Sequence, residues 1–265
     1  MKRFFIVALG RSGIAFLAHL LNLDPRARVV HEPCPGDRQL LFYRYAGCFA
    51  ELLEQLLDQR FNRVLSETSE LEGVEVYGEV NGYLRYEVDW LRARGWACFF
   101  LVRDGRNFVR SAYSRPAYTP QDIQQPIAPK DGDPLAASWA DMDRFARLCW
   151  LWHHTNDYLL SKFNEAIRLE DIISDYSCFQ EQLLRPLDLN IPELTWRREV
   201  NKPRNTGQDH LFRARLKYLL SGGASRPRVA KLPRPNEWSR GMKTVFNDIC
   251  AGTMARLGYQ SFDQF

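Results

Sequence analysis

The sequence FFIVALGRSGIAFLAHLL at residues 4–21 decides the fold. Residues 4–9 are apolar without polar alternation, which is typical of a strand buried on both faces of a parallel sheet. A short turn, GRSG, follows at once. Residues 14–22 then place apolar side chains at helical spacing. The stretch therefore predicts a strand, a tight turn and a helix, the repeating unit of α/β proteins.

The same alternation continues through the first 115 residues. Further strands are predicted at 27–33, 74–80 and 96–102, and further helices at 38–60, at 83–94 and from Arg106 or Asn107 onward. Strands that alternate with helices form parallel sheets through right-handed crossovers. We therefore expect an α/β, P-loop-like three-layer fold, with a central, mostly parallel sheet flanked by helices.

The rest of the chain has a different character. Residues 116–134 are rich in proline and polar side chains, so we expect a long loop or lid there. The patterns then predict a Trp-rich helix at 135–163, a short strand leading into a helix at 166–172, a second loop at 221–236 and a last helix at 239–256. Because no internal repeat or second core is visible, residues 1–265 are predicted to form a single domain.

Composition and charge describe an ordinary globular protein, with 45% hydrophobic and 26% charged residues. The 36 basic and 32 acidic residues leave a net charge of +4, which does not favour a nucleic acid as partner. The six scattered cysteines form no CxxC pair, so we expect reduced thiols rather than zinc ligands or disulfides. The apolar run near Met1 is too short for a signal peptide or a membrane span, so a cytoplasmic protein is expected. The oligomeric state stays open.

The GRSG turn has the features of an anion site. A loop between a strand and a helix directs backbone N–H groups at one point, at the positive end of the helix dipole. Arg11 adds a permanent charge and Ser12 adds a hydroxyl. No Lys-Ser/Thr follows Gly13, so no residue is present to ligate Mg²⁺. The turn predicts a phosphate held without a metal, although it fits a purely structural strand–helix turn equally well.

A second candidate anion site follows the strand at 96–102. Arg103 stands where that strand ends, and Ser111 lies eight residues later in the next helix. Because ligands collect at the carboxyl ends of parallel strands, both side chains are expected to converge near the GRSG turn. The alternative is an arginine at a solvated strand end and a serine that faces water.

Together, GRSG and VRDGRNFVRS (residues 102–111) resemble the motifs of the PAPS-dependent sulfotransferase family, closest in style to its carbohydrate and tyrosylprotein members. Those enzymes move the sulfuryl group of 3′-phosphoadenosine-5′-phosphosulfate (PAPS) to a hydroxyl, need no metal and release PAP. The resemblance implies that Arg103 and Ser111 hold the 3′-phosphate. It implies that the 5′-phosphosulfate is held by Gly10, Arg11, Ser12, Gly13, Ile14 and Ala15.

The sequence departs from the family pattern in two places. The family usually has Thr-Thr where this chain has Ile14-Ala15, which removes two hydroxyl contacts to the phosphate. A lysine that often aids catalysis has no counterpart in YGEVNGYL (residues 77–84), so Arg11 is expected to supply more of the charge. These departures keep a second hypothesis open, a degenerate PAP-binding protein. A third is a metal-dependent P-loop kinase, which the missing Lys-Ser/Thr disfavours.

A general base must take the proton of the acceptor hydroxyl. Glu32 ends the predicted strand VVHEP and stands 21 residues after Arg11, a spacing similar to that of the catalytic glutamate in tyrosylprotein sulfotransferases. Glu32 is our predicted base, with His31 second. The alternative is a glutamate that only pairs with a nearby arginine. The acceptor is expected to be a carbohydrate or another small-molecule or lipid alcohol.

Several other residues are weaker candidates for ligand contacts. Residues 201–208 are polar and basic. A later loop carries four cations and resembles a basic C-terminal loop that closes over the donor in related enzymes. These cations are Arg226, Arg228, Lys231 and Arg234. Each of these fits a solvated loop better than a specific contact. His153 and His154 on the Trp-rich helix fit the core or the surface better than a catalytic role.

Overall fold

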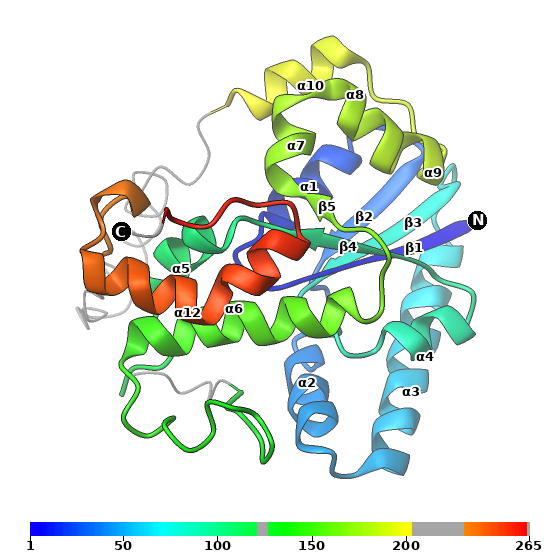
Figure 1. The fold of residues 1–265 in the computed structure, drawn as a ribbon. Coiled ribbons are helices and arrows are strands. Elements are labelled where there is room, and N and C mark those ends of the chain that lie inside the picture. The colour runs from blue at the N-terminus through cyan, green and yellow to red at the C-terminus, as the bar shows by residue number, and fades with distance from the viewer. Residues whose placement is uncertain (121–126, 203–230, 264–265) are drawn as a thin grey trace, which may run out of the picture.

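The central feature of the computed structural model is a five-stranded, fully parallel sheet with the order β2-β3-β1-β4-β5 (Figure 1). The structure describes residues 1–120, 127–202 and 231–263. The strands are β1 (Lys2–Ala8), β2 (Ala27–His31), β3 (Val76–Asn81), β4 (Ala97–Val102) and β5 (Ile167–Arg168). The predicted α/β fold with a parallel sheet flanked by helices is confirmed.

Helices cover both faces of the sheet because β1 is apolar on both sides. Phe4 and Ile6 belong to one buried cluster, and Phe5 and Val7 belong to the other, as the alternation of side chains along a strand requires. The first cluster packs under α1 (Ile14–Leu21), α7 (Leu169–Ser174), α8 (Tyr176–Phe179), η1 (Gln180–Leu184), α9 (Arg185–Leu187) and α10 (Glu193–Val200). The second packs under α2 (Asp37–Ala46), α3 (Ala50–Ser69), α4 (Val88–Ala93), α5 (Gly105–Tyr113), α6 (Arg144–Leu160) and α12 (Arg240–Arg256).

The helix predicted at 38–60 is wrong, because two helices stand there. The first, α2, ends at Gly47, whose φ of 70° is left-handed, the conformation that glycine adopts at helix ends. Phe49, with φ 57°, precedes α3. The helical periodicity of the sequence continues across this break and therefore hides it.

Two further boundaries differ from the predictions. The helix expected at 83–94 begins only at Val88. The Trp-rich helix begins at Arg144 rather than at 135, because the Asp143 side chain accepts a hydrogen bond from the Ala146 N–H and caps it. The short strand leading into a helix that was predicted at 166–172 is confirmed, as β5 and α7.

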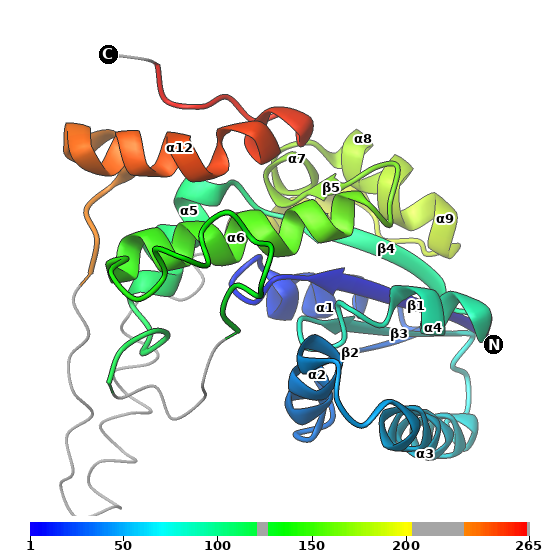
Figure 2. The same cartoon turned by 60° about the horizontal axis from the view of Figure 1, so that its bottom comes forward.

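The C-terminal part of the described chain completes the layer beside α6. A short 3₁₀ turn, η2 (Pro235–Glu237), precedes α12, and Figure 2 shows α12 lying along α6. Residues 116–120 and 127–134 contain no helix or strand, as predicted. Within the described ranges, none of the helices is both long and apolar enough to cross a bilayer. The single-domain assignment stays a prediction.

Candidate functional site

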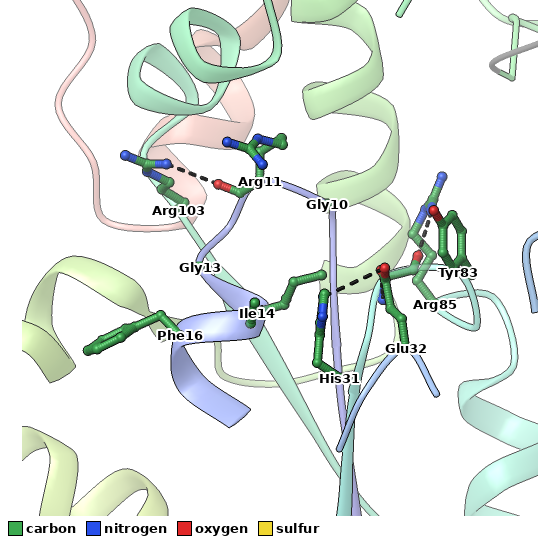
Figure 3. Close-up of a pocket in the computed structure, with 12 residues that line it drawn as sticks. Gly10, Arg11, Gly13, Ile14, Phe16, His31, Glu32, Tyr83, Arg85 and Arg103 are labelled. Atoms are coloured by element: carbon green, nitrogen blue, oxygen red, sulfur yellow. Dashed lines mark hydrogen bonds and ion pairs between the residues drawn. The ribbon is translucent and has the colours of Figure 1, made fainter. Parts of the chain in front are cut away.

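A pocket of about 310 Å³ opens at the carboxyl edge of the sheet, where the segments after β1, β2, β3 and β4 meet (Figure 3). This is the edge at which parallel sheets bind ligands. The structure brings together there all of the predicted site residues except Ser12 and Ser111. The lining residues are Gly10, Arg11, Gly13, Ile14, Ala15, Phe16, His31, Glu32, Gly82, Tyr83, Arg85 and Arg103.

The loop after β1 is held in a conformation that presents the start of α1 to this pocket. Arg11 and Gly13 have positive φ angles of 78° and 82°. A Cβ on Gly13 would lie 2.8 Å from the Leu169 side chain, so only glycine fits. Because the first N–H groups of a helix lack intrahelical partners, the N–H groups of Ile14 and Ala15 are donors beside the pocket.

Arg11, Arg103 and Ser111 form one hydrogen-bonded group. Arg103 Nη1 donates to the backbone oxygen of Arg11 at 3.0 Å, and Arg11 Nε donates to Ser111 Oγ at 3.1 Å. Burial lowers the pKa of both arginines, and the positive charges of Arg115 and Arg103 lower that of Arg11 further. Crowded, partly desolvated cations of this kind are stabilised by an anion. The predicted convergence of the two motifs is therefore present in the structure, with Ser111 behind Arg11 rather than on the pocket wall.

Glu32 stands at the end of β2 in an unusual backbone conformation. Its φ is 45°, which is rare outside glycine and asparagine and is typical of functional positions. Its Oε1 accepts a hydrogen bond of 3.3 Å from the Gly82 N–H, and His31 Nε2 lies 3.6 Å from Oε2 (Figure 3). Burial raises the pKa of Glu32, and the charge of Asp37 raises it further, against the opposing effects of His31, the Gly82 N–H and Arg85. A carboxylate with a raised pKa is a stronger base.

Gly82 lets three strand ends approach one another closely. A Cβ at this position would lie 3.1 Å from Glu32 Oε1 and 3.3 Å from both the Ala8 oxygen and the Gly10 nitrogen. Such contacts are tighter than ordinary packing. Because Gly82 has no side chain, the GRSG loop and Glu32 can both lie close to its backbone.

Behind Glu32 lies a buried cluster of charges. The Arg60 guanidinium donates to both carboxylate oxygens of Asp37, at 2.9 and 2.8 Å, and to both of Glu79, at 2.6 and 2.5 Å. Asn81 donates to Asp37 at 2.7 Å. One guanidinium therefore pairs with two buried carboxylates, Asp37 at the start of α2 and Glu79 in β3, and the charge of Asp37 acts on Glu32.

Tyr83 and Arg85 are pocket residues that the sequence analysis missed. They lie in a turn after β3, where a helix was predicted. The Asn81 side-chain oxygen accepts from the Tyr83 N–H at 2.8 Å, as in an Asx turn. The dipeptide Asn81-Gly82 was the available signal, because Asn-Gly is a strong turn marker.

The weaker candidates that the structure describes do not line this pocket. Arg226, Arg228 and most of residues 201–208 lie outside the described residues, and Lys231 and Arg234 are exposed. His153 Nδ1 lies 2.7 Å from Thr253 Oγ1 on α12. His154 stacks on Trp150, with ring centroids 4.7 Å apart.

Comparisons with known proteins give distant structural likenesses alone. No family model and no curated protein matches the chain. A solved structure of a sulfotransferase domain from the curacin biosynthetic pathway is similar to it at a TM-score of 0.44 and 13% identity, over 98% of this chain and 99% of that chain. Because both values are low, the functional conclusion rests on this chain's own residues.

Proposed function

We propose that this chain transfers the sulfuryl group of PAPS to an acceptor hydroxyl without a metal ion. The observation that carries the proposal is the meeting of Arg11, Arg103 and Glu32 at one pocket. Arg11 and Arg103 come from the motifs that resemble donor-binding motifs of sulfotransferases. Glu32 is a partly buried carboxylate at the same edge of the sheet.

The donor is proposed to lie across the GRSG loop. The N–H groups of Ile14 and Ala15 at the start of α1 and the Arg11 guanidinium would hold the 5′-phosphosulfate. Arg103 uses one N–H for the Arg11 backbone oxygen, and a guanidinium has five, so donors remain for the 3′-phosphate. Ser111 would share that phosphate while it keeps the Arg11 side chain in position.

In the proposed reaction, the acceptor oxygen attacks sulfur in line with the departing 5′-phosphate. The new sulfur–oxygen bond forms as the bond between sulfur and the 5′-phosphate oxygen breaks, PAP leaves, and the acceptor proton passes to Glu32. Arg11 and the loop N–H groups would neutralise the charge that develops on the phosphate. His31 would assist by holding the Glu32 carboxylate from its second oxygen.

One observation favours a second candidate, a PAP-binding protein without turnover. Ile14 stands where the family that this chain resembles has a threonine, and its side chain is buried in the core. The donor would therefore be held by fewer side-chain contacts than in that family.

The test of both candidates is calorimetry with PAP followed by a transfer assay with ³⁵S-labelled PAPS against a set of alcohols and sugars, with EDTA present. The proposed function predicts PAP binding, and label transfer that Glu32→Gln slows by about 10²- to 10⁴-fold. PAP binding with no transfer to any acceptor supports the second candidate. Absence of PAP binding rejects both, and magnesium-dependent ATP turnover would instead indicate a kinase.

A further inference from the structure

Arg85 is a buried cation that ends in the pocket. It is 5% exposed, its Nη1 donates to the Gly82 backbone oxygen at 2.6 Å, and its Nε has no hydrogen-bond partner among the described residues. No carboxylate in the described part of the chain forms a salt bridge with it. Arg60, at 7% exposed, is bonded to two carboxylates. The Glu32 carboxylate acts on Arg85 only from beyond salt-bridge distance, and a buried charge is costly unless it is paired, so Arg85 has room for an anionic partner within the described part of the chain.

Arg85 stands on the side of the pocket away from the proposed donor site. Figure 3 shows Arg85 and Tyr83 on one side of Glu32, and Arg11 and Arg103 on the other. The Arg85 charge lowers the pKa of Glu32, whereas the cations that act on Arg11 are Arg115 and Arg103. The donor phosphates thus have their own cations, and Arg85 faces the side from which an acceptor would approach Glu32.

The orientation of Arg85 is fixed by its neighbours. Its guanidinium carbon lies 5.2 Å from the centroid of the Tyr86 ring, and the bond to the Gly82 oxygen holds one nitrogen. A planar fork held in this way is suited to an oxyanion, to which guanidinium binds through two parallel N–H groups.

We infer that Arg85 binds a negatively charged group on the acceptor, so that the substrate is an anionic alcohol bearing a carboxylate, a phosphate or a sulfate ester. The inference rests on the proposed function, because it takes the acceptor side of the pocket from the proposed donor position. It makes Arg85 a specificity-determining residue. A neutral acceptor would leave the charge of Arg85 unpaired. Sites that leave a buried polar group unpaired discriminate against such an acceptor by about 100-fold or more.

The experiment uses matched pairs of alcohols that differ only in charge. Hydroxy acids and their methyl esters test a carboxylate, sugar phosphates and the free sugars test a phosphate, and sulfated and desulfated sugars test a sulfate ester. Transfer from ³⁵S-labelled PAPS is measured for each pair, and binding of each compound to the PAP-saturated protein is measured by calorimetry. The variants are Arg85→Gln and, as a control on an exposed arginine of β2, Arg28→Gln.

We expect at least one anionic member to bind and react, and its neutral partner to do so about 100-fold less well. In Arg85→Gln this preference should disappear while the Kd for PAP is unchanged, and Arg28→Gln should behave as the original protein. Lack of any preference for anions, in binding or in transfer, overturns the inference, as does a preference that survives in Arg85→Gln. An equal loss on all acceptors overturns it as well, because Arg85 would then act on the transferred sulfuryl group. Failure of PAP to bind the unaltered protein marks the separate failure of the proposed function.

Discussion

The Arg103 guanidinium donates a hydrogen bond of 3.0 Å to the backbone oxygen of Arg11, across 92 positions of sequence. This bond joins the segments that follow β1 and β4. It places the cations of both motifs at one pocket and supports the left-handed backbone of Arg11. The two motifs therefore meet at one pocket, and under the proposed function a change at Arg103 should be felt at both ends of a bound donor.

Replacing Arg103 with alanine should weaken PAP binding by about 10- to 150-fold, since a hydrogen bond to a charged group contributes about 1.5–3 kcal/mol. The measurement is calorimetry with PAP. The control is Arg28→Ala, which removes an exposed cation from β2. Equal Kd values for Arg103→Ala and the unaltered protein would remove Arg103 from the donor site.

Replacing Glu32 with glutamine should lower kcat by about 10²- to 10⁴-fold, the usual contribution of a general base. The Kd for PAP should stay the same, because Glu32 is not part of the proposed donor site. Glu51→Gln, an exposed change in α3, is the matched control. If Glu32→Gln keeps full turnover while His31→Gln loses it, the base is His31.

The pH dependence of kcat should report the carboxyl of Glu32. Only the ionised form accepts a proton, so activity falls as the pH drops through the pKa of Glu32. Burial raises that pKa above its ordinary value of 4.5, so the acid limb should lie above pH 4.5. A positive charge on His31 opposes this shift, so His31→Gln should move the limb to higher pH. A limb at or below pH 4.5 would show that Glu32 is not the base.

Two neighbouring substitutions separate packing from phosphate contact at the start of α1. Ile14 is 6% exposed in the core, so Ile14→Thr should lower the free energy of unfolding by about 1–3 kcal/mol because it buries a hydroxyl and loses a methyl group. Ala15 is exposed, so Ala15→Thr should leave stability unchanged and strengthen PAP binding several-fold. Thermal unfolding and calorimetry measure the two effects. Weaker PAP binding in Ala15→Thr would place the phosphate away from this turn.

Replacing Arg60 with methionine should lower the free energy of unfolding by about 3–5 kcal/mol, because it leaves two carboxylates buried without their cation. Chemical denaturation measures the loss, and Arg63→Met on the exposed side of α3 is the control. Adding Asp37→Asn and Glu79→Gln should recover part of the loss. No recovery would mean that Arg60 stabilises the protein by packing rather than by charge.

The parallel sheet and the position of the pocket followed from short-range patterns. Unbroken apolar runs identify strands that are buried on both faces, and parallel strands end at one edge, so Arg11, Glu32 and Arg103 had to lie near one another. Neither inference needs side-chain geometry, and for this reason both could be made from one sequence.

The remaining features depend on tertiary contacts or on a single turn. Residues 83–87 lie within a helical pattern, yet the Asn81 side chain and Gly82 form a turn there, which brings Arg85 to the pocket. Ile14 appeared as a lost phosphate ligand, but it packs with Leu17 against the sheet. The periodicity of a sequence shows which side chains are apolar. It does not show which of these side chains are covered by a segment that is distant in the sequence.

Titration of the protein with PAP in the presence of EDTA tests the central claim most directly. The account predicts stoichiometric binding without a metal ion, weakened at least tenfold by Arg103→Ala and unchanged by Glu32→Gln. The absence of binding, or binding that Arg103→Ala leaves untouched, would contradict it.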